Sequence, residues 1–264
     1  MKKYVALLSV VLSLLMVQTA SATTSVYLIG NGDSQDTAVK NILTNYGFAV
    51  TIGDSYNSFK GSSSLNSYNA VLLAPEFTGG GSSMPDAGQT ALLNYVKSGG
   101  GLVTTEWTFW VYSQGRFATL GPALPASSGG AYDYYSSATY TKNVTNPTID
   151  FNLPDSFTFS SLHNMGGTES QLTPKGGATV FFNSTYGGSG AYGGLVGWTY
   201  GSGHVISFSI LADQPQPNSN FNQLLANSVN WAEGTPVPVP GTLLLLGSGL
   251  LGLAGLGRRK FSKS

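Results

Sequence analysis

The first half of the sequence alternates between two hydrophobic periods, and this alternation limits the folds that the chain can adopt. Short apolar runs rich in β-forming residues end at glycine or proline, and residues with helical spacing follow them. The expected strands are 25–29, 48–52, 68–74 and 102–105, with helices beginning after Ser34 and at Pro85. Strands that alternate with helices pair in parallel through right-handed crossovers. The sequence therefore predicts an α/β fold with a doubly wound, mainly parallel sheet.

The carboxyl ends of these strands are where such a sheet binds ligands. Glu76 and Glu106 follow two neighbouring expected strands, so their carboxylates are candidates for the acid and base pair of a glycosidase. Burial beside Trp107 would favour the protonated form of Glu106 that a general acid needs. The alternative for Glu106 is a carboxylate that is hydrogen-bonded to loop backbone or exposed to solvent.

The second half has a different character. Aromatic residues gather between 107 and 140 among Gly, Ser and Pro, and we expect an irregular excursion over the strand ends. Trp107, Trp110 and Tyr112 are candidates for stacking on sugar rings, although aromatic side chains also pack loops. The elements expected beyond it are a strand at 178–183, a β-hairpin of strands 194–200 and 204–210, and a closing helix capped by Asn218 or Ser219.

The N-terminus reads as a secretory signal peptide. Lys2 and Lys3 precede an apolar run, and Ala20-Ser21-Ala22 supplies an A-x-A cleavage site. Residues 1–22 are therefore expected to be removed during export.

The C-terminus has three parts in fixed order. A proline-rich linker at 235–241 is followed by an apolar run at 242–257 and a basic tail at 258–264. At about 1.5 Å per residue the apolar run is short for a bilayer. It contains eight leucines and no charge, so it is expected to form a transmembrane helix with the basic tail in the cytoplasm.

The order of these three parts resembles a known address. The residues that carry the resemblance are Pro238, Val239 and Pro240 and, after the apolar run, Arg258, Arg259 and Lys260. They are similar to the PEP-CTERM sorting signal of Gram-negative bacteria, with Val239 in place of the usual acidic residue. The resemblance implies a precursor anchored in the inner membrane and facing the periplasm. An exosortase would then process it for the cell surface or the exterior, usually alongside exopolysaccharide. A permanent membrane anchor is the alternative.

Composition restricts the domain between the two signals, residues 23–234. All twelve acidic residues but only six of the twelve basic residues lie there, which gives a formal charge of −6 and argues against nucleic-acid binding. Charged residues make up 9% of the chain, so its surface is polar without being ionic. Cysteine is absent, which excludes disulfides, thiolate metal sites and a cysteine nucleophile.

Several segments of this domain follow the pattern of a known fold. They are YNAVLLAP at 68–75, KSGGGLV at 97–103, the run from Asn146 to Pro154, and GSGHVISFS at 201–209. Together they resemble the class I glutamine amidotransferase-like fold, in particular ThuA-like domains. The resemblance implies a fold and no activity, because the amidotransferases use a cysteine with His and Glu partners. Where ThuA-like domains often show His after the Gly-Gly-Gly strand, this chain has Thr105 and Glu106.

Two further features are weaker candidates for binding sites. The turn from Asn31 to Ser34 could present backbone amides to an anion or oxygens to a divalent ion, but Asp33 and Asp36 make a helix N-cap the better interpretation. His163 and His204 lack carboxylates at metal-ligand spacing, so no metal and no cofactor is expected.

Two classes of function remain. The first is an exported, non-catalytic protein of the cell surface or extracellular matrix, associated with exopolysaccharide. The second is a polysaccharide-active hydrolase that uses Glu106 and Glu76. The separation of the two carboxyl groups distinguishes the two classes.

Overall fold

The structure is a computed structural model, and it describes residues 23–61, 63–75, 83–134, 137–160, 168–185, 192–210 and 218–234. The signal peptide, the linker, the predicted transmembrane helix at 242–257 and the basic tail lie outside these ranges. Within them, no helix is both long and apolar enough to cross a membrane.

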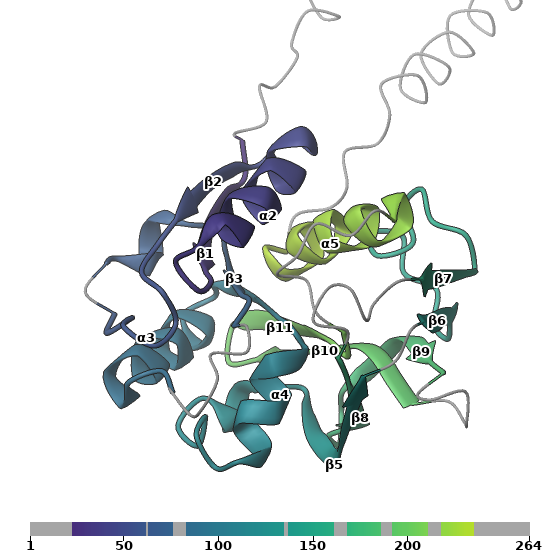
Figure 1. Ribbon diagram of the computed structural model, residues 1–264. Helices are drawn as coiled ribbons and strands as arrows, with labels where there is room; N and C mark the ends of the chain where they lie inside the picture. Colours follow the sequence, from purple (N-terminus) through teal and green to yellow (C-terminus); the bar gives the residue numbers. More distant parts are fainter. Residues whose placement is uncertain are drawn as a thin grey trace, which may run out of the picture.

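An eleven-stranded sheet with helices on both faces makes up the described part of the chain (Figure 1). The helices are α2 (Ser34–Asn45), α3 (Asp86–Lys97), α4 (Glu106–Ser113) and α5 (Ser219–Ala232). The strands are β1 (Ser25–Ile29), β2 (Ala49–Ile52), β3 (Ala70–Leu73), β4 (Gly101–Thr104), β5 (Ala126–Tyr134), β6 (Ser137–Lys142), β7 (Ser156–Ser160), β8 (Thr168–Pro174), β9 (Thr179–Ser184), β10 (Tyr192–Tyr200) and β11 (Gly203–Phe208).

The centre of the sheet is parallel, as the sequence predicts. Strands β2, β1, β3, β4 and β11 lie side by side in that order, and each pair runs in the same direction. The chain leaves β1 toward β2 on one side and returns to β3 on the other. This is the strand order of a doubly wound sheet, so the carboxyl ends of β1, β3, β4 and β11 meet at one edge.

The second half adds more antiparallel strands than the single predicted hairpin. The hairpin of β10 and β11 is confirmed, with Tyr200 paired to Gly203 at its turn. Beyond β10 the order continues through β9, β6 and β7, all antiparallel, and β8 pairs with both β10 and β5. The mainly parallel sheet is therefore confirmed for the centre, and the flank is an antiparallel extension.

The irregular excursion expected between 107 and 140 is wrong. This segment contains α4, β5 and β6, and α4 begins at Glu106. The helix is apolar nearly all round its circumference, so it lacks the amphipathic stripe that identifies a surface helix and is instead a buried one. Strand β5 begins Ala-Ser-Ser-Gly-Gly, which gives no alternating pattern of apolar residues.

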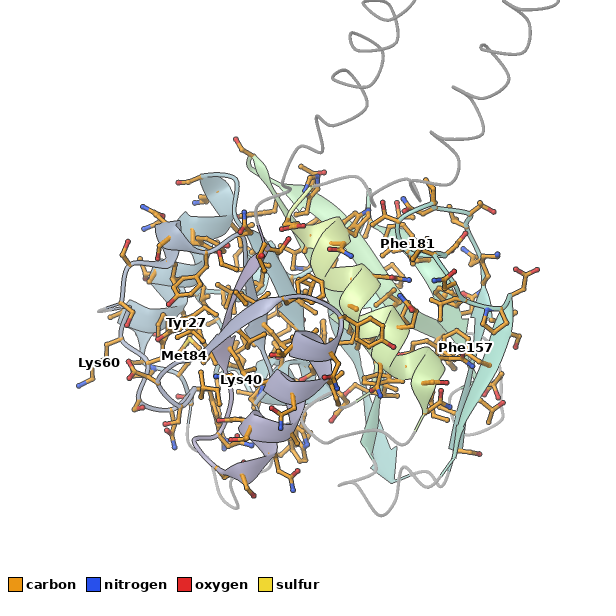
Figure 2. The ribbon with its side chains drawn as sticks, turned by 90° about the horizontal axis from the view of Figure 1, so that it is seen from above. Tyr27, Lys40, Lys60, Met84, Phe157 and Phe181 are labelled. Carbon is orange, nitrogen blue, oxygen red and sulfur yellow. The ribbon has the colours of Figure 1, made fainter. Side chains whose placement is uncertain are left out.

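The two faces of the sheet bury separate apolar clusters. Helices α2 and α5 cover one face, and α3 and α4 cover the other. Adjacent residues of one strand divide between the faces, as Val26 and Tyr27 do in β1, because side chains alternate along a strand. In the view from above, α5 lies between α2 and the labelled side chains of Phe157 and Phe181 (Figure 2).

Two of the predicted helix caps are confirmed. The side chain of Asp33 accepts a hydrogen bond from the Gln35 amide at the start of α2. Asn218 does the same for the amides of Asn220 and Phe221 at the start of α5. These caps fix where the two helices on the same face begin.

Candidate functional site

The carboxyl edge of the central strands holds most of the buried polar side chains. Glu106 is the first residue of α4 and directly follows the end of β4 through Thr105, and its exposed fraction is 0%. The side-chain hydroxyl of Ser170 on β8 donates a hydrogen bond of 2.6 Å to Glu106 Oε1. This donor and the position at a helix N-terminus both stabilise a carboxylate. The carboxylate is thus fixed in place and removed from solvent.

Other hydroxyl groups surround this carboxylate along the strand ends. Thr104 Oγ1 and Ser207 Oγ share a hydrogen bond of 2.7 Å between β4 and β11. The side-chain oxygens of Thr105 and Thr108 are buried without a hydrogen-bond partner among the described residues. We call Thr104, Thr105, Glu106, Thr108, Ser170, Ser207 and Ser209 the strand-end cluster. Buried polar groups are normally paired, so the two threonine hydroxyls mark the start of α4 as unusual.

Tyr140 connects the strand-end cluster to the antiparallel flank. Its hydroxyl donates to the carbonyl of Gly194 at 2.7 Å and lies 2.8 Å from Ser209 Oγ. The ring of Tyr140 is 0% exposed and packs edge-on against Phe159 at 4.9 Å. Sequence reasoning missed Tyr140, Ser170, Ser207 and Ser209. The signal for Ser207 and Ser209 was present, because they alternate with apolar residues in a buried strand.

The predicted carboxylate pair is not brought together in the described part of the chain. Glu76 lies outside the described residues, so its distance from Glu106 stays a prediction. The exposed-carboxylate alternative for Glu106 is wrong, since this side chain is fully buried.

The aromatic residues near Glu106 are less exposed than a sugar-stacking surface requires. Trp107 is 2% exposed, and its ring contacts Trp110 edge-on at 4.9 Å, so it presents no face to a sugar in this structure. Trp110 and Tyr112 are partly buried. The guanidinium of Arg116 lies 5.7 Å from the Trp110 ring, and Lys175 Nζ lies 5.9 Å from the Tyr112 ring. Cations thus occupy positions near both of these rings.

His204 lies away from the strand-end cluster. It pairs with Gly101 at the amino end of β4 and its ring lies 5.1 Å from that of Trp231. Since Glu106 follows the carboxyl end of β4, the two side chains belong to opposite edges of the sheet. His163 lies outside the described residues. Among the residues that the structure places, no group of three or more His, Asp or Glu side chains could hold a metal ion.

The turn after β1 is used to start α2. Asp36 is 3% exposed and accepts hydrogen bonds from the amides of Asn31 and Gly32, at 3.1 and 2.7 Å. A Cβ atom on Gly30 would lie 1.8 Å from Asp36 Oδ1, so only glycine leaves room for this carboxylate. The amides that could have faced an anion are therefore occupied by a side chain of the same turn.

The C-terminal segment behind α5 matches a known family. Residues 236–260 match the model of the PEP-CTERM protein-sorting motif. The tail is a PEP-CTERM sorting motif. The PEP-CTERM motif implies an exported protein with a membrane-anchored precursor that an exosortase processes. No curated protein matches the chain in sequence.

Several solved structures share the fold of the domain in front of the PEP-CTERM motif. A putative ThuA-like protein from Parabacteroides merdae is 14% identical with a TM-score of 0.62, over 82% of this chain and 92% of that one. A putative GMP synthase protein from Thermoplasma acidophilum is 12% identical with a TM-score of 0.52, over 80% of this chain and 94% of that one. A β-galactosidase from Rahnella sp. R3 is 12% identical with a TM-score of 0.54, over 81% of this chain and 32% of that one. At these identities the similarity shows the fold alone, which is consistent with the predicted amidotransferase-like architecture.

Proposed function

We propose that the exported domain is a non-catalytic protein of the cell surface or extracellular matrix, and that it associates with exopolysaccharide. The observation that carries this proposal is the PEP-CTERM motif at 236–260, which begins two residues after the glycine that ends α5. A folded domain joined directly to a sorting signal is delivered to the outside of the cell.

The junction between β4 and α4 supports a scaffold without catalysis. The amidotransferases that the domain resembles use a cysteine on a sharp turn after a strand, and this chain contains no cysteine. At the junction stands Glu106, which is completely buried and bonded to Ser170. A carboxylate enclosed in this way holds α4 and β8 together.

The experiment is mass spectrometry on the protein from its own cells, with and without the gene for the exosortase. We expect the wild-type protein in the surface or medium fraction, starting at Thr23 and lacking the residues from Leu243 onward. Without the exosortase, the tail should remain attached and the protein should stay in the membrane fraction. A cytosolic protein with both ends intact would contradict export. Co-sedimentation with exopolysaccharide purified from the same cells tests the association.

A second candidate function is hydrolysis of a polysaccharide. It is favoured by the position of Glu106, a buried carboxylate beside Trp107 at the carboxyl end of a central strand. The β-galactosidase from Rahnella also contains this architecture over about a third of its length. Release of reducing ends from the purified exopolysaccharide by the wild-type protein, and its loss in Glu106→Gln, would support hydrolysis. Equal and negligible release by both proteins would refute it.

A further inference from the structure

A polar groove lies at the amino edge of the sheet, on the opposite edge from Glu106. Two adjoining cavities of about 410 and 240 Å³ share Asn66, Tyr95 and Ser98 in their walls. We call this the amino-edge groove, and the side chains that matter in it are Asn66, Asn69, Asn94, Tyr95, Ser98 and Glu233. Cavities of about 300 to 1,000 Å³ are the size of small-molecule binding sites.

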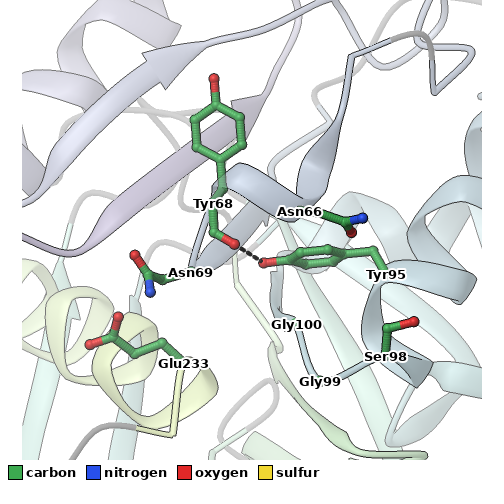
Figure 3. Close-up of a pocket in the computed structure, with 8 residues that line it drawn as sticks. All are labelled: Asn66, Tyr68, Asn69, Tyr95, Ser98, Gly99, Gly100 and Glu233. Carbon is green, nitrogen blue, oxygen red and sulfur yellow. Dashed lines mark hydrogen bonds between the residues drawn. The ribbon is translucent and has the colours of Figure 1, made fainter.

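The wall of the groove is fixed before any ligand arrives. The hydroxyl of Tyr95 donates a hydrogen bond of 3.0 Å to the backbone carbonyl of Tyr68 (Figure 3). A Cβ atom on Gly100 would lie 2.2 Å from Tyr95 Cζ, so the ring occupies space that only glycine leaves open. Asn66 and Ser98 lie on either side of this ring (Figure 3). A rigid wall of this kind reduces the entropy that a ligand loses on binding.

The polar side chains along the groove have hydrogen-bonding capacity to spare. The amides of Asn66 and Asn94 and the hydroxyl of Ser98 are exposed and make no side-chain hydrogen bond within the described residues. Asn69 Oδ1 accepts from the amide and the hydroxyl of Ser25, both at 2.9 Å, which leaves its amide nitrogen to donate elsewhere. Neutral donors and acceptors alternate along the groove, and they match the hydroxyl groups of a sugar chain.

The electrostatics of the groove disfavour anions. Helix α3 ends at its C-cap Ser98 and α5 ends at its C-cap Glu233, so the negative ends of two helix dipoles meet here. Of the residues that the structure describes, Glu233 is the one charged residue that lines either cavity, and its Oε1 accepts from Thr24 Oγ1 at 2.9 Å. The last turn of α3 contains Lys97, which does not line the groove. A ligand with donors fits this field, whereas carboxylated or sulfated sugars would be repelled.

We infer that the amino-edge groove binds a segment of a polysaccharide without anionic groups, and that this is where the domain contacts exopolysaccharide. The inference rests on the proposed association with exopolysaccharide and gives that association a site. The groove adjoins Glu233, just ahead of the PEP-CTERM motif. A chain bound there lies at the side of the domain from which the sorting tail departs.

The test compares two double variants of the protein purified from its own host. Asn66→Ala with Asn94→Ala removes two amides of the groove. Asn41→Ala with Asn45→Ala removes two exposed amides of α2 that do not line it and serves as the matched control. Binding to exopolysaccharide purified from the producing cells is measured by calorimetry, with cellohexaose as an uncharged probe and polygalacturonate as an anionic probe.

We expect the groove variant to bind the exopolysaccharide about tenfold more weakly than wild type, since each lost hydrogen bond is worth several-fold in affinity. The control should bind as wild type does, cellohexaose should bind in the same order of variants, and polygalacturonate should not bind. Equal binding by wild type and groove variant would overturn the groove as the site and leave the association standing. Preference for polygalacturonate would overturn the charge argument and with it the inferred ligand class. Wild-type protein that binds no exopolysaccharide would overturn both the association and the groove.

Discussion

Ser170 Oγ donates a hydrogen bond of 2.6 Å to Glu106 Oε1, although 64 positions separate the two residues in the sequence. The bond joins the antiparallel strand β8 to the first residue of α4, at the carboxyl edge of the parallel strands. Ser170 also donates its backbone amide to the carbonyl of Ser209, just beyond β11, at 2.8 Å. One serine therefore links both halves of the sheet at the most deeply buried charge-bearing side chain of the strand-end cluster.

Replacing Ser170 by alanine removes the hydroxyl donor from a buried carboxylate. Hydrogen bonds to charged groups contribute about 1.5 to 3 kcal/mol, so we expect Ser170→Ala to lower the free energy of unfolding by about that amount. Urea denaturation measures the change. Ser127→Ala is the control, because its hydroxyl makes only a 3.5 Å contact with the carbonyl of Thr173. Equal stability of the two variants would show that the Ser170 bond contributes nothing.

Gly101 allows β4 and α5 to approach each other closely. A Cβ atom at this position would lie 2.5 Å from the carbonyl carbon and oxygen of Ala232, which are backbone atoms that cannot rotate away. We expect Gly101→Ala to destabilise the fold by about 1 to 3 kcal/mol or more, as overpacked cores do. Thermal and urea unfolding measure this loss.

Gly176→Ala is the matched control for that change. No atom outside its neighbours lies within 4 Å of its Cβ position, and its backbone φ is not positive. Alanine there should leave stability unchanged or raise it by about 0.4 to 1 kcal/mol through the unfolded state. A similar loss in both variants would point to glycine flexibility as the cause, and not to the contact with Ala232.

Asn227 holds the connection between β6 and β7 against α5. Its side-chain amide is 1% exposed and donates to the carbonyls of Ile149 and Phe151, at 2.9 and 2.8 Å. Asn227→Ala leaves both carbonyls without this donor, so we expect a loss of about 2 to 4 kcal/mol in unfolding free energy. Hydrogen exchange should also show faster opening of this connection. Asn220→Ala on the same helix provides a comparison, and an equally small effect of both would contradict the assigned role.

The parallel half of the fold could be predicted because its signals are local. The apolar run of β1 and the helical spacing of α2 each lie within a dozen residues and are separated by glycine. The antiparallel flank gives weaker signals. Strand β8 reads TESQLTP, with few apolar residues and no strict alternation, and its place is set by partners far along the chain.

The candidate site was predictable only in part for the same reason. Glu106 was identified because it follows a strand end, which is a local feature. Its partner Ser170 belongs to a strand that the sequence did not reveal, and Tyr140 reaches Ser209 across 69 positions. The amino-edge groove gave no signal, since its asparagines and serines resemble the many others in this polar chain.

Tyr95 gives the protein a predictable response to alkaline pH. Burial raises the pKa of the Tyr95 hydroxyl, and the nearby carboxylate of Glu233 raises it further. In the unfolded chain a tyrosine titrates near about 10, so above this pH the unfolded state loses a proton that the folded state keeps. The stability that neutral Tyr95 provides is therefore complete below about pH 9, and falls above about pH 10 by up to about 1.4 kcal/mol per pH unit.

Tyr95→Phe isolates this effect. Near pH 8 the variant should be less stable by about 1 kcal/mol, because it lacks the hydrogen bond to the carbonyl of Tyr68. Between about pH 10 and pH 11 the difference should shrink and then change sign, since phenylalanine has no proton to lose in the unfolded state. Urea unfolding of both proteins across this range measures the difference, and other titrating groups cancel between them. A difference that stays constant up to about pH 11 would mean that Tyr95 ionises as readily in the fold as in the unfolded chain, and that the wall of the amino-edge groove is open to water.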